Sequence, residues 1–268
     1  SQSGALGVAL MGKSVTENMG LSAVVSIGNG ADISESEALE YLGRDDVTQV
    51  IFMYMEGCKR GREFLEIASR VSRLKPIIVI KSGSSAKGAL AAASHTGSLA
   101  GSDKVFSAAL RQAGVIRADT LSDAFNWTRA LASQPLPKAR GAVIVTNGGG
   151  VGVLASDAAE RHDVGLNNDI EMLERVFRPT MPQFGSTKNP VDVTGQARNE
   201  EYGMALKAAL EEESIPSVLA LYCTPATMDV RKFAETAIQY TAELAGRKPL
   251  VYSIIGGGGV YEAINLLN

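Results

Sequence analysis

Short runs of apolar, mostly β-branched residues alternate along this chain with longer amphipathic stretches. Runs at 23–28, 49–55 and 76–81 are separated by stretches at 34–45 and 61–74 in which apolar and charged residues have helical spacing. Strands that are apolar throughout are buried on both faces, as in a parallel sheet with helices on both sides. The alternation therefore predicts an α/β fold with mainly parallel sheets.

The pattern is interrupted once and then starts again. A weaker strand at 115–119 and a helix at 121–133 are followed by the Pro-containing segment QPLPKARG at 134–141, the best candidate for a linker. Further strands are expected at 142–147, 218–224 and 249–255, and further helices at about 150–162, 200–213 and 228–245. A chain of 268 residues is longer than one core usually serves. We therefore expect two α/β domains, residues 1–134 and 138–268.

The two predicted domains begin differently. The second opens with a strand, a Gly-rich turn and a helix, whereas the first opens directly at SQSGALG (1–7), as if its strand were missing. A missing strand leaves a sheet edge that must be covered, either by residues outside this sequence or by another subunit. Residues 256–268 are expected to form a turn and a helix. We interpret the chain as part of a longer polypeptide.

Charge and cysteine content exclude several classes of protein. Lys and Arg number 26 against 29 Asp and Glu, a net charge of −3, so there is no general positive field for nucleic acid or anionic lipid and any phosphate must be bound locally. Cys58 and Cys223 are too few for a disulfide scaffold or a four-Cys zinc site. No apolar run has the length of a membrane span, and no signal peptide is visible. We expect a cytoplasmic protein without nucleic-acid or membrane partners.

One motif near the start resembles a nucleotide-binding loop. Gly7, Gly12, Lys13 and Ser14 have the GxxxxGKS spacing in which backbone amides and a lysine hold phosphates. That loop needs a strand just before it and a helix that begins at its GK pair, but the intervening VALM is apolar. The segment is better interpreted as the first helix of the domain, beginning at Ser3–Gly4.

Two Gly-rich turns each lead into an apolar helix, at 1–7 (SQSGALG) and 147–157 (NGGGVGVLASD). Unpaired amides and the positive end of the helix dipole let such helix starts bind phosphate without cationic side chains. We expect the two starts to be able to face one anion. The alternative is that the glycines only let each helix pack against its strand. Val153 breaks a strict GxGxxG at 148–153, which weakens the case for classical dinucleotide binding.

The segment 81–103 has few bulky residues and contains His95, one of two histidines. Ser94, Thr96 and Gly97 surround His95 with hydroxyls and flexible backbone, so we expect a loop that can move, with His95 as a nucleophile or an acid/base group. The alternative is an ordinary surface histidine, and His162 is interpreted in that way. No spacing of His, Cys or carboxylates supports a metal site.

Two carboxylates follow predicted strands or turns. Glu56 ends the strand at 49–55 and precedes Gly57, at the carboxyl edge where open α/β sheets place their sites. A carboxylate there could accept one imidazole N–H and leave the other ring nitrogen nucleophilic. A solvated Glu at a strand end is the alternative. Asp192 lies in NPVDVTG (189–195), where turn formation alone could explain it.

Taken in order, these segments resemble the NDP-forming acyl-CoA synthetases, especially the ADP-forming acetate–CoA ligases, and more distantly succinyl-CoA synthetase. The segments that carry the resemblance span 1–7, 26–33, 54–57, 75–83, 91–103, 146–158 and 189–195. The resemblance implies two flavodoxin-like, succinyl-CoA synthetase-like domains. It places a transient phosphohistidine at His95 and the glutamate that holds it at Glu56. It places phosphate-binding helix starts at Ser3, Gly4 and Ala5 and at Gly148, Gly149 and Gly150.

The same resemblance implies a reaction, acyl-CoA + ADP + phosphate to acid + ATP + CoA, through an acyl phosphate and phosphohistidine. It implies an oligomeric enzyme that uses CoA, ADP or ATP, and Mg²⁺. The CoA-binding domain and the ATP-grasp domain of the family have no counterpart in this sequence, so we expect the chain alone to be inactive. GNGADI (28–33) lacks a Lys that the family commonly has there.

Two other functions stay open at this point. Related synthetase-like regions fused to protein acetyltransferases sense ligands without turnover, but His95 and Glu56 are both present here. A generic CoA- or nucleotide-binding α/β protein is the second alternative. The residues leave open the acyl group, the choice between ADP and GDP, and whether the full protein is one chain or two.

Overall fold

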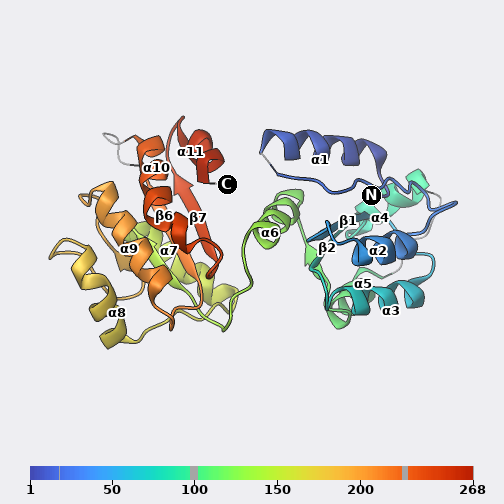
Figure 1. Ribbon diagram of the computed structural model, residues 1–268. Helices are drawn as coiled ribbons and strands as arrows, with labels where there is room; N and C mark the ends of the chain where they lie inside the picture. Colours follow the sequence, from blue (N-terminus) through green and yellow to red (C-terminus); the bar gives the residue numbers. More distant parts are fainter. Residues whose placement is uncertain (18, 97–101, 225–228, 268) are drawn as a thin grey trace. The chain divides into compact units, whose positions relative to one another are not determined.

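The computed structural model describes residues 1–17, 19–96, 102–224 and 229–267, without the side chains of 92–96. The chain divides into two compact units, Ser1–Ser133 and Gln134–Asn268, and each is described by itself (Figure 1). The division falls at the start of the Pro-containing segment that interrupts the sequence pattern. Within the described ranges, no helix has both the length and the apolar character needed to cross a membrane.

Unit 1 contains a parallel sheet of β1 (Ile51–Met55), β2 (Ile77–Lys81) and β3 (Ile116–Ala118), in the order β1-β2-β3. Met55 pairs with Lys81, so β1 and β2 end at the same level of the sheet. The helices of this unit are α1 (Gly4–Thr16), α2 (Glu35–Arg44), α3 (Gly61–Val71), α4 (Ala86–Thr96), α5 (Asp103–Gln112) and α6 (Leu121–Ser133).

Alternate residues of the central strand β2 face different helices. Ile77 and Val79 belong to a buried cluster with side chains of α2, α3 and α5, whereas Ile78 packs with Ala124 of α6. Figure 1 shows α2, α3 and α5 grouped together and α6 apart from them. Both faces of the sheet are therefore covered, which is why its strands are apolar throughout.

Unit 2 contains a parallel sheet in the order β5-β4-β6-β7. Its strands are β4 (Val143–Thr146), β5 (Val191–Asp192), β6 (Val218–Cys223) and β7 (Leu250–Ile255). Its helices are α7 (Gly149–Arg161), α8 (Ile170–Phe177), α9 (Asn199–Glu211), α10 (Val230–Thr241) and α11 (Val260–Leu267), with 3₁₀ turns at Arg178–Thr180 and Ala242–Leu244. The parallel pairing in both units confirms the predicted α/β fold.

The core of unit 2 is centred on Tyr202 of α9. Its ring makes edge-to-face contacts with Tyr222 and Phe233, with centroids 5.6 and 5.2 Å apart. Its hydroxyl lies 2.9 Å from the carbonyl oxygen of Val145 and 3.0 Å from that of Leu221. The side chain therefore ties β4 to β6 just before the Gly-rich turn that follows β4.

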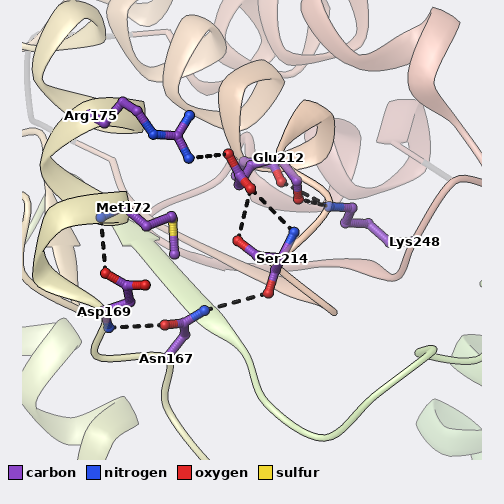
Figure 2. Close-up of polar contacts among 8 residues, drawn as sticks. Asn167, Asp169, Met172, Arg175, Glu212, Ser214 and Lys248 are labelled. Carbon is purple, nitrogen blue, oxygen red and sulfur yellow. Dashed lines mark hydrogen bonds and ion pairs between the residues drawn. The ribbon is translucent and has the colours of Figure 1, made fainter.

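A polar cluster fixes the chain where α9 ends (Figure 2). The Glu212 carboxylate accepts hydrogen bonds from the Ser214 hydroxyl and from Arg175, both at 2.8 Å. The Ser214 hydroxyl, and after it Arg175, lowers the pKa of Glu212. The Lys248 ammonium donates to the carbonyl oxygens of Ala209 and Glu212, at 3.2 and 2.5 Å, and its burial lowers its pKa. Lys248 thus satisfies two carbonyls at the end of the helix, and Ser214 and Arg175 hold the Glu212 carboxylate beside them.

The predicted strand at 23–28 is wrong. The segment belongs to no strand of the described sheets, and it ends at Gly28, which has a positive φ of 53° and lies in a turn. Ser1 supplies its backbone partners, since the Ser1 nitrogen donates to Val25 at 2.7 Å and the Ile27 amide donates to Ser1 at 3.0 Å. One residue cannot form a ladder along the whole segment, so β-branched composition alone does not make a strand here.

The predicted loop at 81–103 is also wrong over much of its length. Residues Ala86–Thr96 form α4, and α5 begins at Asp103, while 97–101 lie outside the described residues. The run AKGALAAAS is rich in Ala and contains Leu and Lys, all strong helix formers. Helix propensity decides the conformation of this segment even though it has few bulky residues to bury.

Candidate active site

The start of α1 has the form expected for an anion-binding helix terminus. Ser3 is the N-cap, and its hydroxyl oxygen accepts a hydrogen bond from the Leu6 amide at 3.3 Å. The helix begins at Gly4, and Gly4 and Ala5 are exposed. The expected start at Ser3–Gly4 is confirmed. The Ser3 amide donates to the Ser1 hydroxyl at 3.1 Å, so Gly4 and Ala5 are the exposed residues whose first-turn amides can meet an anion.

The GxxxxGKS spacing lies entirely inside α1 and forms no loop. Lys13 is in the last turn, where it pairs with Glu17 and its ammonium lies 4.7 Å from the centre of the Phe125 ring. Its GK pair therefore lies near the carboxyl end of a helix, the end that repels phosphate. The interpretation of this segment as an ordinary first helix is confirmed.

Glu56 immediately follows β1 and is half-buried. It lines a cavity of about 520 Å³ together with Gln2 and Lys81. The Tyr54 hydroxyl donates a long hydrogen bond to its carboxylate, at 3.4 Å. The structure thus places Glu56 at the carboxyl edge of the unit 1 sheet, as the sequence predicts, and turns it toward a cavity.

Gln2 is a site residue that the sequence analysis missed. Its backbone amide donates to the Tyr54 carbonyl at 3.1 Å, and its side chain bonds to the backbone of Glu56 and Gly57. Ser3 is the next residue along the chain. The start of α1 and the Glu56 segment are therefore joined directly, although they are more than 50 positions apart in the sequence.

Lys81 is a second cavity residue without a clear sequence signal. It ends β2 opposite Met55, and its ammonium donates to the Ser82 carbonyl. The pKa of Lys81 is lowered, mainly by desolvation and further by the neighbouring Arg117, although the Asp103 and Glu56 carboxylates act to raise it. A lysine at the end of an apolar strand usually reaches into solvent, so only the fold reveals this half-buried position.

His95 lies in the last turn of α4, and its side chain is outside the described residues. Its proposed contact with Glu56 therefore stays a prediction. His162 is the exposed C-cap residue of α7, which agrees with its interpretation as a surface histidine.

In unit 2, Gly148 is the N-cap residue and α7 begins at Gly149. Gly149 and Gly150 are exposed, and a Cβ atom at Gly150 would have no neighbour within 4 Å. A Cβ atom at Gly149 would lie 3.0 Å from the Asp192 Oδ2 atom. This helix start is open on one side and closed by a carboxylate on the other.

The turn around this helix start is held by side-chain hydrogen bonds. Asp192 Oδ1 accepts from the Thr194 amide at 2.8 Å, the turn contact that the sequence allows for. The Asn147 side chain accepts from the Cys223 amide and donates to the Cys223 carbonyl, both at 2.8 Å. These bonds fix the carboxyl ends of β4, β5 and β6 around the Gly-rich turn. Whether this helix start and that of α1 serve one phosphate stays a prediction.

The described residues offer little alternative chemistry. Within them, no three or more His, Cys, Asp or Glu side chains are grouped as metal ligands. Burial, and then the neighbouring Glu35, raise the pKa of Cys58 to about 12, so its thiol stays protonated. The chemical features of the site among the described residues are the amide groups at the helix starts, the Glu56 carboxylate and the Lys81 ammonium in the cavity.

Comparison with known families assigns a match to each unit. Residues 1–131 match the family described as "Succinyl-CoA ligase like flavodoxin domain", and residues 142–268 match the "Ligase-CoA domain". The two matches together cover nearly the whole chain.

Relatives match the chain from end to end. The alpha subunit of ADP-forming acetate–CoA ligase I from Pyrococcus furiosus is 53% identical over 268 residues, which are 100% of this chain and 58% of the relative. The ADP-forming 4-hydroxybutyrate–CoA ligase from Nitrosopumilus maritimus is 37% identical over 96% of this chain and 36% of its own length.

A solved structure has the same fold. The dinucleotide forming acetyl-coenzyme A synthetase 1 of Candidatus Korarchaeum cryptofilum, in complex with phosphate and ADP, superposes with a TM-score of 0.94 at 41% identity. The similarity covers 99% of this chain and 58% of that one. The chain thus spans less than two thirds of the length of these relatives.

Proposed function

Because the chain belongs to the NDP-forming acyl-CoA synthetases, we propose that it carries the phosphotransfer core of an ADP-forming acid–CoA ligase. The proposal rests on one observation. Gln2 directly precedes the exposed helix start Ser3–Gly4–Ala5, bonds to the Glu56 backbone at the sheet edge, and lines one cavity together with Glu56. A helix start binds phosphate, and a carboxylate orients an imidazole. Both are needed for transfer through a phosphohistidine.

The proposed reaction has three steps. A phosphate oxygen attacks the thioester carbonyl of acyl-CoA, the C–S bond breaks, and CoA leaves as the thiol after taking up a proton. A ring nitrogen of His95 then attacks phosphorus, the P–O bond to the acyl group breaks, and the acid leaves as a carboxylate. Finally a terminal oxygen of ADP attacks phosphorus, the N–P bond breaks, and ATP forms.

In this scheme the chain supplies positioning and charge stabilisation, which are what phosphoryl transfer mainly requires of a protein. Glu56 accepts the N–H of the non-reacting ring nitrogen and keeps the other nitrogen free. The helix starts at Ser3–Gly4–Ala5 and at Gly148–Gly149–Gly150 bind phosphate oxygens. The donors are the amides after the first residue of each start, because the Ser3 and Gly148 amides already donate to the hydroxyls of Ser1 and Thr146. Because backbone dipoles do this, a net charge of −3 is no obstacle.

We further propose that the complete enzyme contains CoA-binding and ATP-grasp domains in addition to units 1 and 2, and that it uses CoA, ADP or ATP, and Mg²⁺. The Pyrococcus furiosus relative is a subunit of which this chain covers 58%, which supports that view. The relatives act on acetate or 4-hydroxybutyrate, so the acyl group is to be determined by substrate screening. A cytoplasmic, oligomeric enzyme fits this assignment.

Labelling with γ-³²P ATP and Mg²⁺ tests the proposal in the complete enzyme. We expect label on His95 that is stable to alkali and lost in acid, as for a phosphoramidate. His95→Ala should abolish both the label and net turnover while the protein stays folded. His162→Ala is the matched control and should keep the label. Undiminished labelling of His95→Ala would contradict the proposal.

A further inference from the structure

We propose that Gln2 is a positioning residue that couples the phosphate-binding start of α1 to the orientation of Glu56. The inference rests on the proposed function of Glu56 and extends it to a residue that needs no contact with a substrate. It is carried by the hydrogen bonds of one half-buried side chain.

Both polar atoms of the Gln2 side-chain amide form hydrogen bonds. Oε1 accepts from the backbone N–H of Glu56 and, at 3.1 Å, from that of Gly57. Nε2 donates to the Gly57 carbonyl at 3.0 Å. A primary amide is suited to this position because it has an acceptor oxygen with two lone pairs beside an N–H donor.

The backbone of the same residue extends the contact along β1. The Gln2 N–H donates to the Tyr54 carbonyl at 3.1 Å, so residue 2 pairs with the strand while its side chain holds the two residues after the strand. On its other side, Ser1 is bonded to Val25 and Ile27. Hydrogen bonds to β1 and to residues 25 and 27 therefore hold residues 1 and 2 in place. A fixed Gln2 in turn fixes the start of α1 relative to Glu56.

These bonds determine where two functional groups lie. The peptide that bears the Glu56 side chain is held by its own N–H, so the carboxylate leaves the backbone from a fixed point. Ser3, which follows Gln2, caps α1 and so sets where the first helical amides lie. The distance from the phosphate-binding amides to the carboxylate thus depends on Gln2, whose side chain holds residues 56 and 57 while its backbone pairs with β1.

Loss of this coupling should reduce the rate of phosphoryl transfer without weakening nucleotide binding. Displacement of a catalytic group by about 1 Å can cost on the order of 10²-fold in rate. Gln2→Met keeps the length of the side chain but removes all three side-chain hydrogen bonds. We expect it to slow formation of phosphohistidine at least about 10-fold, with the KM for ATP changed less than about 2-fold.

A double-mutant cycle in the complete enzyme tests the inference, with the single-turnover rate of His95 phosphorylation as the readout. Glu56→Gln should slow this rate by roughly 10². If Gln2 acts through Glu56, adding Gln2→Met to Glu56→Gln should cost less than about 3-fold more, because coupled residues are not additive. Gln112→Met, on the exposed end of α5, is the matched control and should leave the rate unchanged.

The outcomes separate this inference from the proposed function. Multiplicative effects in the cycle, or a wild-type rate for Gln2→Met with a slow Glu56→Gln, would overturn the role of Gln2 alone. A wild-type rate for Glu56→Gln would overturn the proposed role of Glu56 as well. Circular dichroism and urea unfolding check that each variant is folded. If Gln2→Met fails to fold, the shorter amide in Gln2→Asn replaces it in the same cycle and must show the same non-additive loss.

Discussion

Replacement of Gly4 by Val should separate phosphate binding from folding at the start of α1. Gly4 is the first residue of the helix and is exposed. A Cβ atom there would lie 3.6 Å from the Ser26 Oγ atom, an ordinary van der Waals contact. The backbone and its surroundings therefore accept a side chain, and the added methyl groups lie beside the amides that we propose as phosphate donors.

The substitution should affect stability and activity by very different amounts. Val has a slightly higher helix propensity than Gly, so the free energy of unfolding should change by no more than about 0.5 kcal/mol. Loss of one well-placed backbone donor typically costs 10²–10³ in kcat, and a branched side chain obstructs the approach of the anion itself. We expect phosphorylation of His95 to fall by roughly 10² or more.

Gly12→Val is the matched control in the same helix. Gly12 is exposed, and a Cβ atom there has no neighbour within 4 Å, so the substitution is the same but lies away from the helix start. Rates of phosphohistidine formation and urea unfolding curves are to be measured for both variants. Equal activity of the two variants would refute phosphate binding at Gly4, and so would a Gly4→Val variant that loses stability before activity.

Three further predictions concern the packing and charge of the two units. Lys13→Ala should leave His95 phosphorylation nearly unchanged, because an exposed ion pair with Glu17 contributes little to stability. A loss of about 10-fold or more would instead support the interpretation of GxxxxGKS as a nucleotide-binding loop. Tyr202→Phe should lower the free energy of unfolding by about 1–2 kcal/mol in urea titrations, because its hydroxyl bonds are buried; an unchanged midpoint would contradict this. The lowered pKa of Glu212 stabilises the fold above the carboxyl's unfolded pKa of about 4.3, and this contribution is lost as pH falls through the folded pKa (Figure 2). Glu212→Gln should thus be less stable than wild type by up to about 1 kcal/mol at pH 7, and this difference should shrink as the pH falls below the unfolded pKa; a constant difference would be inconsistent with this linkage.

The sequence predicted well the elements whose residues carry their own local signals. The apolar run of β2 needs burial on both faces, and the structure provides helices on both. Ser3 and Gly4 combine a capping side chain with a small first residue, and α1 begins there. The GxxxxGKS spacing was dismissed because it lacked a preceding strand, and the structure confirms that it lies within the helix.

Predictions failed where tertiary partners or propensity override composition. Residues 23–28 have strand composition, but among the described residues their backbone bonds go to Ser1 and, in a turn, to Gly30, so they join no described sheet. Residues 86–96 were expected to be a loop because they lack bulky side chains, yet Ala-rich sequence favours a helix even where there is little to bury. In the first case the absence of a neighbouring strand decides the structure, and in the second case helix propensity does; composition alone decides neither.

Gln2 shows why part of the candidate site has no signal in a single sequence. Glutamine is common on surfaces, and nothing in SQSGALG says which backbone its amide will reach. The partner is defined only once β1 carries Glu56 and Gly57 to the sheet edge beside the start of α1, and the amide then has two N–H donors and one carbonyl in reach. Glu56 was predictable because strand ends in α/β folds have a known place, whereas a side chain that bonds to backbone carries no motif of its own. Further positioning groups of this candidate site are therefore to be sought among residues that bond to the backbone just beyond these strand ends, by structure rather than by motif.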